Sequence, residues 1–329
     1  MIALTTNNLQ KLESVPSIAN IQHVHEAIAP YIHRTPILTC ESINAIAGAE
    51  LYFKCENFQK IGAFKMRGAT SAALALSEAE IGKGLATHSS GNHAQAVALT
   101  AKNLGTKAYI VMPSNSPAVK KKAVAGYGAE ITFCEPTQAA REATMAEIVA
   151  ETGATFIHPY DDYNVIAGQA TCAKEVFEDC PILDAIIAPI GGGGLMSGTA
   201  LSAKYFSPMT KIYGGEPEIV NDAYRSLQSG QLQQNTTTDT IADGLKTNLS
   251  DKTFGIIQEH LEEIILVNET EIADAMRLIW ERMKIIIEPS CAVPLAAILK
   301  HPAPFSQRKV GLILTGGNVD LEKLPFTKH

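Results

Sequence analysis

The sequence has few of the features that mark secreted, membrane-spanning or nucleic-acid-binding proteins. Its six cysteines stand far apart without a C-x-x-C pair, which excludes the common zinc fingers and predicts buried, reduced thiols in a cytoplasmic protein. The N-terminus lacks the basic and apolar regions of a secretory signal. Apolar runs such as residues 285–287 are much shorter than the roughly 20 residues of a membrane span. Lysine and arginine total 27 against 34 aspartates and glutamates, and this net charge of −7 disfavours a nucleic-acid surface.

Nucleotide-binding signatures are also absent around a run of four glycines, which we call the tetraglycine turn. It comprises Gly191, Gly192, Gly193 and Gly194. Met196 and Ser197 stand where the two frames of G-x-G-x-x-G need a third glycine, and no P-loop lysine follows. A predicted strand over residues 185–190 precedes the turn, and a predicted helix begins at Leu195. Glycine lets backbone N–H groups approach a phosphate at a helix N-terminus, so the segment predicts an anion site or, alternatively, a turn without a ligand.

Short apolar segments alternate with helical stretches along most of the 329 residues, of which 46% are hydrophobic. Further strands are predicted over residues 51–55, 84–88, 108–112, 130–133, 155–157 and 310–314. A helix is predicted from about Asn92 to Leu104, and residues 228–239 are predicted to form a surface loop. The alternation predicts an α/β fold with parallel sheets in three layers. Ligands of such folds bind at the carboxyl ends of the strands, so the loops that follow the strands are the candidate sites.

One of these loops, residues 63–69, carries Lys65 between apolar neighbours at the start of a helix-favouring run. A desolvated lysine has a lowered pKa and can act as a nucleophile or form an imine, although a surface lysine is the alternative. Another loop follows the strand that ends at His88 and has the residues Ser89, Ser90, Gly91, Asn92 and His93. Hydroxyl and amide groups at a helix start can hold a carboxylate or simply cap the helix. A last loop begins with Thr315, whose hydroxyl is suited to bind a heterocycle or to pair with the backbone.

A phosphate cradle without nucleotide motifs, together with a lysine able to form an imine, indicates pyridoxal 5′-phosphate. Residues 62–69, 89–93, 191–195 and 315–318 together resemble the serine/threonine dehydratase and serine racemase family, the fold-type II pyridoxal phosphate enzymes. The resemblance covers nearly the whole chain, from residue 35 to residue 320, and residues 278–284 and 287–289 are most similar to the racemase branch. Ala63 departs from the serine that commonly precedes the Phe-Lys pair.

The resemblance implies two three-layer α/β domains with mostly parallel sheets, similar to the tryptophan synthase β-subunit. Residues 1–70 and 161–329 are expected to form the large cofactor-binding domain, and residues 71–160 the small domain that gates the substrate. The resemblance also implies a homodimer that acts on a small amino acid.

The same resemblance implies roles for individual residues. Lys65 is expected to hold the cofactor as an imine and, once freed, to act as the base on one face, with Ser90 on the opposite face. The expected cofactor-binding residues are Phe64, Lys65, Asn92, Gly191, Gly192, Gly193, Gly194, Leu195, Glu288 and Thr315. The expected substrate-binding residues are Ser89, Ser90, Asn92, His93 and Arg141, the last as a partner for a second substrate carboxylate.

A divalent cation, Mg²⁺ or Ca²⁺, is expected where Glu216, Asp222 and the carbonyl of Val220 match the metal site of the racemase branch. Taken alone, these acidic residues would be a solvated helix start. Gln95 and Lys284 match positions that bind a nucleotide activator in animal serine racemase.

The activity that this resemblance implies is a deaminating dehydratase that converts L-threonine or L-serine to a 2-oxo acid and ammonia. Serine racemase with side dehydratase activity, and threo-3-hydroxyaspartate dehydratase, remain as alternatives. A cysteine-synthase-like transferase is disfavoured because His93 follows Asn92 where that branch usually has threonine. The alternative from another functional class is a non-catalytic phosphate-binding protein. Such a protein would form no imine and would therefore lack a visible absorption band.

Overall fold

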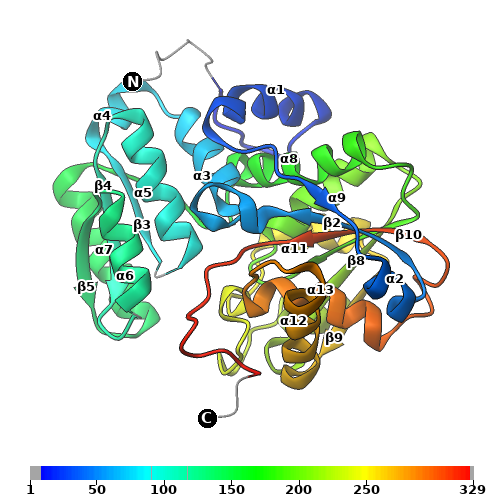
Figure 1. The fold of residues 1–329 in the computed structure, drawn as a ribbon. Helices are drawn as coiled ribbons and strands as arrows, with labels where there is room; N and C mark the ends of the chain where they lie inside the picture. Colours follow the sequence, from blue (N-terminus) through cyan, green and yellow to red (C-terminus); the bar gives the residue numbers. More distant parts are fainter. Residues whose placement is uncertain (1–8, 90, 117, 327–329) are drawn as a thin grey trace.

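The computed structural model describes residues 9–89, 91–116 and 118–326, which form two β-sheets flanked by helices (Figure 1). The six-stranded sheet has the order β1-β2-β10-β7-β8-β9, and the four-stranded sheet has the order β5-β4-β3-β6. The strands are β1 Ile37–Leu38, β2 Glu50–Cys55, β3 Leu85–His88, β4 Ala108–Pro113, β5 Glu130–Cys134, β6 Thr155–Phe156, β7 Ala185–Pro189, β8 Lys211–Pro217, β9 Glu263–Val267 and β10 Lys309–Leu314. Only β1 runs antiparallel to its neighbour among these strands, so the α/β fold with mostly parallel sheets is confirmed.

Helices cover both faces of each sheet. They are α1 Ile18–Ile28, α2 Glu41–Ala47, α3 Lys65–Leu74, α4 Glu78–Lys83, α5 Asn92–Leu104, α6 Ala118–Gly126, α7 Gln138–Thr152, α8 Tyr163–Asp179, α9 Gly194–Phe206, α10 Asp222–Ser229, α11 Asp251–His260, α12 Glu269–Met283 and α13 Pro289–Lys300. Short 3₁₀ helices are η1 Ala29–Tyr31, η2 Glu56–Phe58, η3 Lys60–Gly62, η4 Glu218–Val220 and η5 Asp243–Leu245. In the part of the chain that the structure describes, no helix has both the length and the apolar character to cross a membrane.

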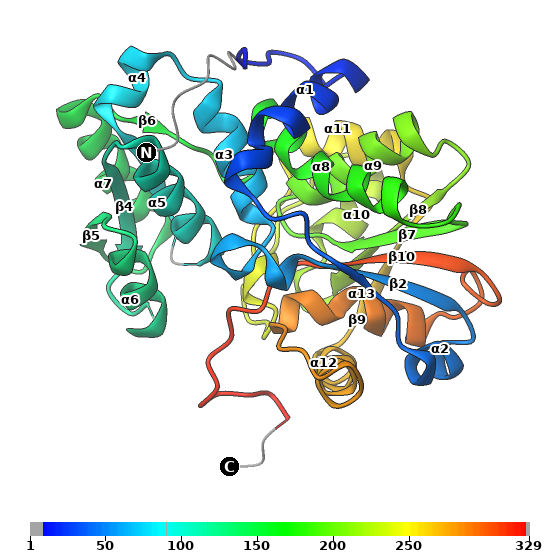
Figure 2. The same ribbon diagram turned by 45° about the horizontal axis from the view of Figure 1, so that its top comes forward.

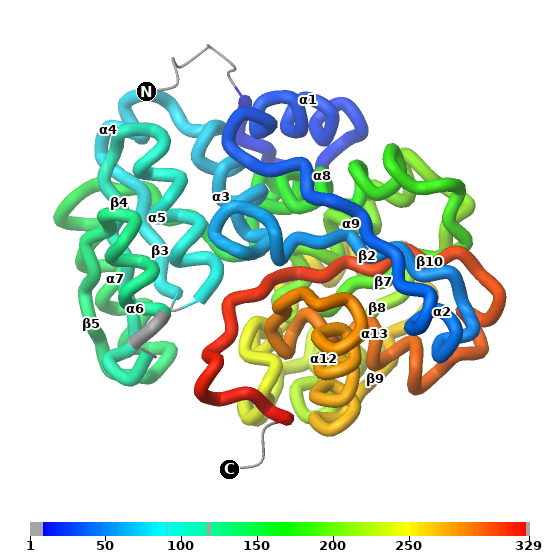
Figure 3. Tube along the Cα trace, in the orientation of Figure 1, coloured from blue at the N-terminus to red at the C-terminus, as the bar shows by residue number. Residues whose placement is uncertain are grey.

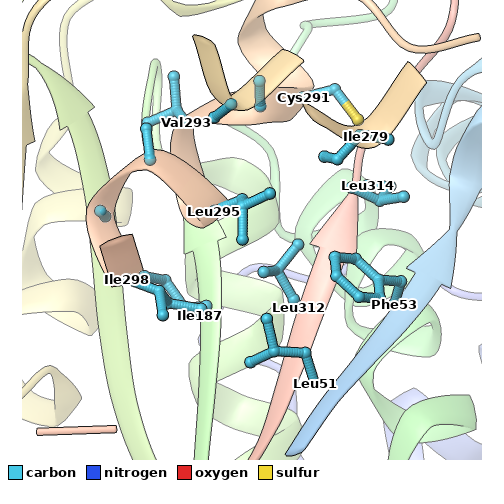
Figure 4. Close-up of a cluster of buried hydrophobic side chains, with 14 of the residues drawn as sticks. Leu51, Phe53, Ile187, Ile279, Cys291, Val293, Leu295, Ile298, Leu312 and Leu314 are labelled. Carbon is cyan, nitrogen blue, oxygen red and sulfur yellow. The ribbon is translucent and has the colours of Figure 1, made fainter. Parts of the chain in front are cut away.

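The large sheet lies between two helical layers (Figure 2). On one face, α13 packs on β7, β8, β9 and β10, with α12 and α2 beside it. Figure 4 shows Leu295 and Ile298 of α13 over Phe53, Ile187 and Leu312 of the strands. On the other face, α9 packs on β7 and β8 and contacts α8 and α11. Each such buried aliphatic or aromatic side chain contributes about 1.5–3 kcal/mol to the free energy of unfolding, so these two layers fix the sheet that bears the candidate site.

The small sheet has α5 on one face and α7 on the other, and α3 joins its core on the α5 side. Its four strands all lie within residues 71–160. The expected boundary between residues 70 and 71 falls inside α3, and the division of the chain at residues 70/71 and 160/161 stays a prediction. After β10 the chain runs past α13 and α12 toward the C-terminus (Figure 3), where Phe326 packs edge-on against Trp280.

All six cysteines are free thiols. The expectation that they are buried is correct for Cys55, Cys172 and Cys291. It is wrong for Cys40, Cys134 and Cys180, which are partly exposed because they lie at a helix start, a strand end and a helix end.

Candidate active site

The tetraglycine turn joins β7 to α9 at the carboxyl edge of the large sheet. Side chains cannot fit there: a Cβ on Gly192 would lie 2.4 Å from the Tyr160 ring, and one on Gly191 would lie 2.9 Å from the Leu245 backbone. Gly193 also has a left-handed φ of 84°, and no side chain caps the N-terminus of α9. The first N–H groups of α9 are therefore free of side-chain caps, which is the geometry that binds a phosphate.

Lys65 is the first residue of α3, and two backbone contacts hold it next to the end of β10. The Phe64 N–H donates to the carbonyl of Thr315 over 3.0 Å, and Ala63 pairs with Gly316 in an isolated β-bridge. Thr315 is itself buried. Because β10 is the neighbour of β7, Lys65 and Thr315 lie at the same sheet edge as the tetraglycine turn.

Lys65 is half-buried, and its Nζ donates to the carbonyl oxygen of Pro159 over 2.7 Å. Desolvation of the amine lowers the pKa of Lys65 to about 8, so a larger fraction of this amine is uncharged near neutral pH than in an ordinary lysine. An uncharged amine is the nucleophilic form, and a lysine of this kind is suited to attack a carbonyl. Nζ also lies 5.1 Å from the centroid of the Phe64 ring.

The segment after β6 contacts both Lys65 and the tetraglycine turn. The Tyr160 ring occupies the space beside Gly192, and the Tyr160 backbone lies beside Gly194. In the same segment, the Ile157 carbonyl accepts a hydrogen bond from His93 Nε2 over 2.9 Å. Sequence reasoning missed Pro159 and Tyr160, although the strand predicted at residues 155–157 implied a loop at a strand's carboxyl end.

The loop before α5 holds several expected substrate residues. Ser89 donates its N–H to the Val111 carbonyl, and its Oγ accepts from the Gly91 N–H over 3.3 Å. Gly91 is the N-cap of α5, so the alternative that Ser89 caps this helix is wrong. Ser90 lies outside the described residues. Burial, together with the charge of Lys65, lowers the pKa of His93 to about 3, so this imidazole is neutral.

Asn92 connects the two sheets through side-chain hydrogen bonds. Its Nδ2 donates to Glu288 Oε1 over 2.8 Å, and its Oδ1 accepts from Asn318 Nδ2 over 2.8 Å. Burial, with a smaller contribution from the charge of Asp243, raises the pKa of Glu288 to about 8. The Glu288 carboxyl is therefore mostly protonated at neutral pH and acts as a neutral partner of Asn92.

Arg141 lies in α7, which packs on β3. Its Nε is buried and has no hydrogen-bond partner among the described residues. Burial and the Arg141 charge both lower the pKa of His88, the last residue of β3. Arg141 is thus close to the strand end from which the Ser89 loop begins.

Two of the expected metal residues, Glu216 and Asp222, lie close to each other. Glu216 lies in β8, and its carboxyl group accepts from the N–H groups of Ala223 and Tyr224 at the start of α10 over 3.0 and 2.9 Å. Asp222 accepts from Asn235 Nδ2 over 2.6 Å and from the Leu249 N–H over 2.8 Å.

Burial raises the pKa of Glu216 to about 8 and that of Asp222 to about 6, and the charge of Asp222 adds to the rise at Glu216. Within the described ranges no three histidine, cysteine or acidic residues cluster as a metal site. A cation here would use these two carboxylates and a carbonyl.

Lys284 lines a surface pocket of about 480 Å³ together with Asn57, Gly62 and Asn318. Gln95 is buried in α5 and does not line this pocket, so the two residues expected at a nucleotide site do not share it.

The residues present fit pyridoxal phosphate. The tetraglycine turn offers N–H groups with no side chain in the way, and Lys65 supplies a desolvated amine of lowered pKa. Thr315 directly follows β10 and has a neutral hydroxyl rather than a carboxylate.

Comparisons with known proteins agree with this chemistry. The chain matches the family model described as "Pyridoxal-phosphate dependent enzyme" over residues 28–316. It is 50% identical to the beta-hydroxyaspartate dehydratase of Paracoccus denitrificans (strain Pd 1222), over 95% of this chain and 99% of that protein. It is also 50% identical to the serine racemase of Dictyostelium discoideum, over 94% of this chain and 96% of that protein.

Among solved structures, a threonine deaminase from T.th. superposes with a TM-score of 0.89 at 43% identity, covering 93% of this chain and 99% of that one. The sequence resemblance to the dehydratase and racemase enzymes is thereby confirmed, and this chain belongs to the family of pyridoxal-phosphate dependent enzymes.

Proposed function

We propose that the chain is a deaminating dehydratase of 3-hydroxy amino acids, which converts them to a 2-oxo acid and ammonia. The observation that carries this proposal is the desolvated amine of Lys65 at the same sheet edge as the tetraglycine turn. Pyridoxal phosphate, when bound, supplies the electron sink that stabilises negative charge at the substrate Cα. Lys65 would hold the cofactor and then remove the Cα proton as a general base.

The neighbouring residues would orient the reacting groups. The N–H groups of the tetraglycine turn would hold the phosphate, and Thr315 would face the pyridine nitrogen. A neutral hydroxyl would leave that nitrogen less protonated than a carboxylate would, which disfavours transamination. The Ser89 loop and the first backbone N–H groups of α5, including that of His93, would bind the substrate carboxylate at this helix N-terminus, where the helix dipole favours negative charge.

Among 3-hydroxy amino acids, Arg141 favours one with a second carboxylate. Its Nε is buried without a partner in the described part of the chain, and a buried donor costs about 1–3 kcal/mol when unsatisfied. The β-carboxylate of 3-hydroxyaspartate would accept from this donor, whereas L-serine and L-threonine have no group that does so. The 50% identity to a beta-hydroxyaspartate dehydratase supports this substrate.

Serine racemisation is the second candidate, because the chain is equally similar to a serine racemase. A racemase needs proton-transfer groups on both faces of Cα, and Ser90 is the proposed partner of Lys65. The proposed function also includes a divalent cation at Glu216, Val220 and Asp222, and a nucleotide activator at Gln95 or Lys284. It further includes a homodimeric assembly and a cytoplasmic location.

The test is chiral product analysis of the purified protein with L-serine, L-threonine and L-threo-3-hydroxyaspartate. We expect 2-oxo acid and ammonia from all three, with the highest kcat/KM for hydroxyaspartate. Arg141→Gln should lower kcat/KM for hydroxyaspartate by about 10-fold or more, since a buried charge-assisted contact is worth about 1.5–3 kcal/mol. It should leave L-serine within about twofold, and the surface variant Arg277→Gln is the control. Racemisation of L-serine without ammonia release would replace the dehydratase proposal by the racemase.

A further inference from the structure

Four charged side chains are buried together around Arg67, two residues after Lys65, and we call them the buried quartet. They are Lys54, Glu56, Arg67 and Glu175. None is more than 1% exposed, and they come from β2, η2, α3 and α8. Two positive and two negative charges balance within the quartet, as burial of ions demands.

Arg67 is the centre of the quartet and makes two forked contacts. Towards η2, its Nε and Nη2 donate to Oε2 and Oε1 of Glu56, each over 2.8 Å. Towards α8, its Nη1 and Nη2 donate to Oε1 and Oε2 of Glu175 over 2.8 and 2.7 Å. Bidentate pairs of this kind fix orientation as well as distance. The guanidinium is therefore held in one plane by two separate elements.

Lys54 has a different place in the quartet. Its Nζ donates to Glu175 Oε2 and to the Thr35 carbonyl, each over 2.7 Å, and neither partner belongs to α3. Although burial favours a high pKa for Glu175, hydrogen bonds from His25 and Arg67 hold the pKa of this carboxyl well below its usual range. Glu175 is thus charged at neutral pH and serves both cations of the quartet.

Stability alone does not account for such a quartet. Well-packed apolar replacements of a buried ion network are often neutral or stabilising, because desolvation offsets the Coulomb attraction. What apolar side chains cannot supply is orientation in two directions at once.

The group that needs this orientation is Lys65, which lies two residues before Arg67. The N-terminus of α3 has no side-chain cap, and Lys65 is its first residue. On one side of Lys65, Ala63 and Phe64 are tied to Gly316 and Thr315 by backbone contacts. On the other side, Arg67 is tied to Glu56 and Glu175. Lys65 therefore lies between two anchors, with its amine directed to the Pro159 carbonyl.

We propose that Arg67 is a positioning residue, which clamps the first turn of α3 to η2 and α8 so that the amine of Lys65 meets the cofactor carbonyl. The proposal rests on the function proposed above, in which Lys65 is the lysine that holds pyridoxal phosphate. Arg67 does not touch the amine, and its charge is neutralised by the two glutamates. It acts through the position of the helix.

The test compares Arg67→Lys and Arg67→Met with Lys54→Met in the full-length protein. The cofactor is stripped with hydroxylamine, pyridoxal phosphate is added back, and covalent attachment is followed by borohydride quenching and peptide mass mapping. Lys54→Met is the matched control, because it leaves the same unbalanced buried charge as Arg67→Met but keeps both forks of Arg67. Melting temperature and non-covalent phosphate binding are measured alongside.

In the wild type we expect attachment at Lys65 with a half-maximal rate near pH 8, the pKa that desolvation gives this amine. Arg67→Lys should slow attachment at pH 7.5 by at least about 10-fold, since displacement of a reacting group by about 1 Å can cost 10²-fold. Its half-maximal pH should move toward the usual lysine range as water reaches the amine. Lys54→Met should lower the melting temperature and keep the rate within about twofold.

The outcomes separate the two proposals. Attachment of the wild type at another lysine would refute the proposed function. Attachment at Lys65 with unchanged rates in the Arg67 variants, or with equal slowing in Lys54→Met, would refute the positioning role alone. If Arg67→Met does not fold, Arg67→Lys and the milder Glu56→Gln, which loosens only the fork to η2, decide the matter by the same readouts.

Discussion

Lys65 and Pro159 are joined across 94 residues of sequence by a hydrogen bond of 2.7 Å from Nζ to the carbonyl oxygen. Lys65 begins α3, whereas Pro159 follows the last strand of the small sheet. The adjacent residue, Tyr160, fills the space over Gly192. The short segment after β6 therefore contacts both the Lys65 amine and the tetraglycine turn. Movement of the small sheet relative to the large one would change the positions of both.

Lys65→Ala should abolish covalent attachment of pyridoxal phosphate and lower turnover by at least about 10²–10⁴-fold, because both the nucleophile and the proposed base are lost. Loss of the visible absorption band and the absence of a borohydride-fixed peptide would show this. Lys107→Ala, at a surface lysine paired with Glu130, is the control and should change neither. A band that persists in Lys65→Ala would contradict the assignment.

Gly192→Ala should weaken cofactor binding and lower the free energy of unfolding by about 1–3 kcal/mol, because the new Cβ would lie 2.4 Å from the Tyr160 ring. Gly255→Ala in α11 is the matched control, since nothing lies within 4 Å of its Cβ position. In a helix this change should stabilise by about 0.5–1 kcal/mol. Denaturant unfolding measures the stability of each variant, and titration with pyridoxal phosphate measures its cofactor affinity. Equal stability and equal affinity of the two variants would refute the assignment of the tetraglycine turn as the phosphate site.

Glu288→Gln should make stability less dependent on pH. The pKa of the Glu288 carboxyl is about 8 in the folded chain and near 4.5 in the unfolded chain, so the folded state binds the extra proton between these values. Wild-type stability therefore falls as pH rises from 4.5 to 8, and the loss is complete above pH 8. Glutamine keeps an acceptor for Asn92 and has no such loss.

Relative to the wild type, the Glu288→Gln variant should thus gain at least about 1 kcal/mol between pH 5 and pH 8, given 1.36 kcal/mol per pKa unit. Urea unfolding at the two pH values measures this, with the exposed Glu281→Gln as the control. A difference between variant and wild type that does not grow with pH would show that the buried carboxyl is charged throughout.

The sequence was sufficient to predict the parallel α/β arrangement because its strands are short apolar runs separated by helical periodicity, as at β7 and β10. The predicted helix Asn92–Leu104 agrees with α5, whose end is fixed by Gly105 in the left-handed conformation. Strand β8 was not predicted, because Gly214 and Gly215 weaken the strand signal. Those glycines make room for Ile190 and Val293, which are distant in sequence.

The residues that complete the site were harder to predict, because they also depend on contacts between segments that are distant in sequence. Lys65 and the tetraglycine turn can be identified from the local sequence, because the residues on either side of them indicate a desolvated amine and a turn between a strand and a helix. Arg67 and Glu175 carry no local mark of burial, because each is an ordinary helix residue until α3 packs on α8. Tyr160 likewise acquires its place only when the segment after β6 meets α9.

A divalent cation should stabilise the fold through Glu216 and Asp222. Burial already raises the pKa of both carboxyls, and a cation between them would offset their repulsion. Mg²⁺ or Ca²⁺ at about 100 times its Kd should add about 2.7 kcal/mol to the free energy of unfolding, and chelator should remove this gain. Thermal melts of metal-free protein with and without each ion measure the effect.

Glu216→Gln should erase that thermal shift while the visible absorption of the cofactor stays, because Lys65 and the tetraglycine turn are untouched. Glu218→Gln, at an exposed carboxylate two residues further on, should keep the full shift. The amide of the variant can still accept from one of the two N–H groups of α10 that now bind Glu216, so the fold should persist. Identical melting curves with and without ion, on protein shown to be metal-free at the start, would refute the metal site and leave the pyridoxal phosphate chemistry unaffected.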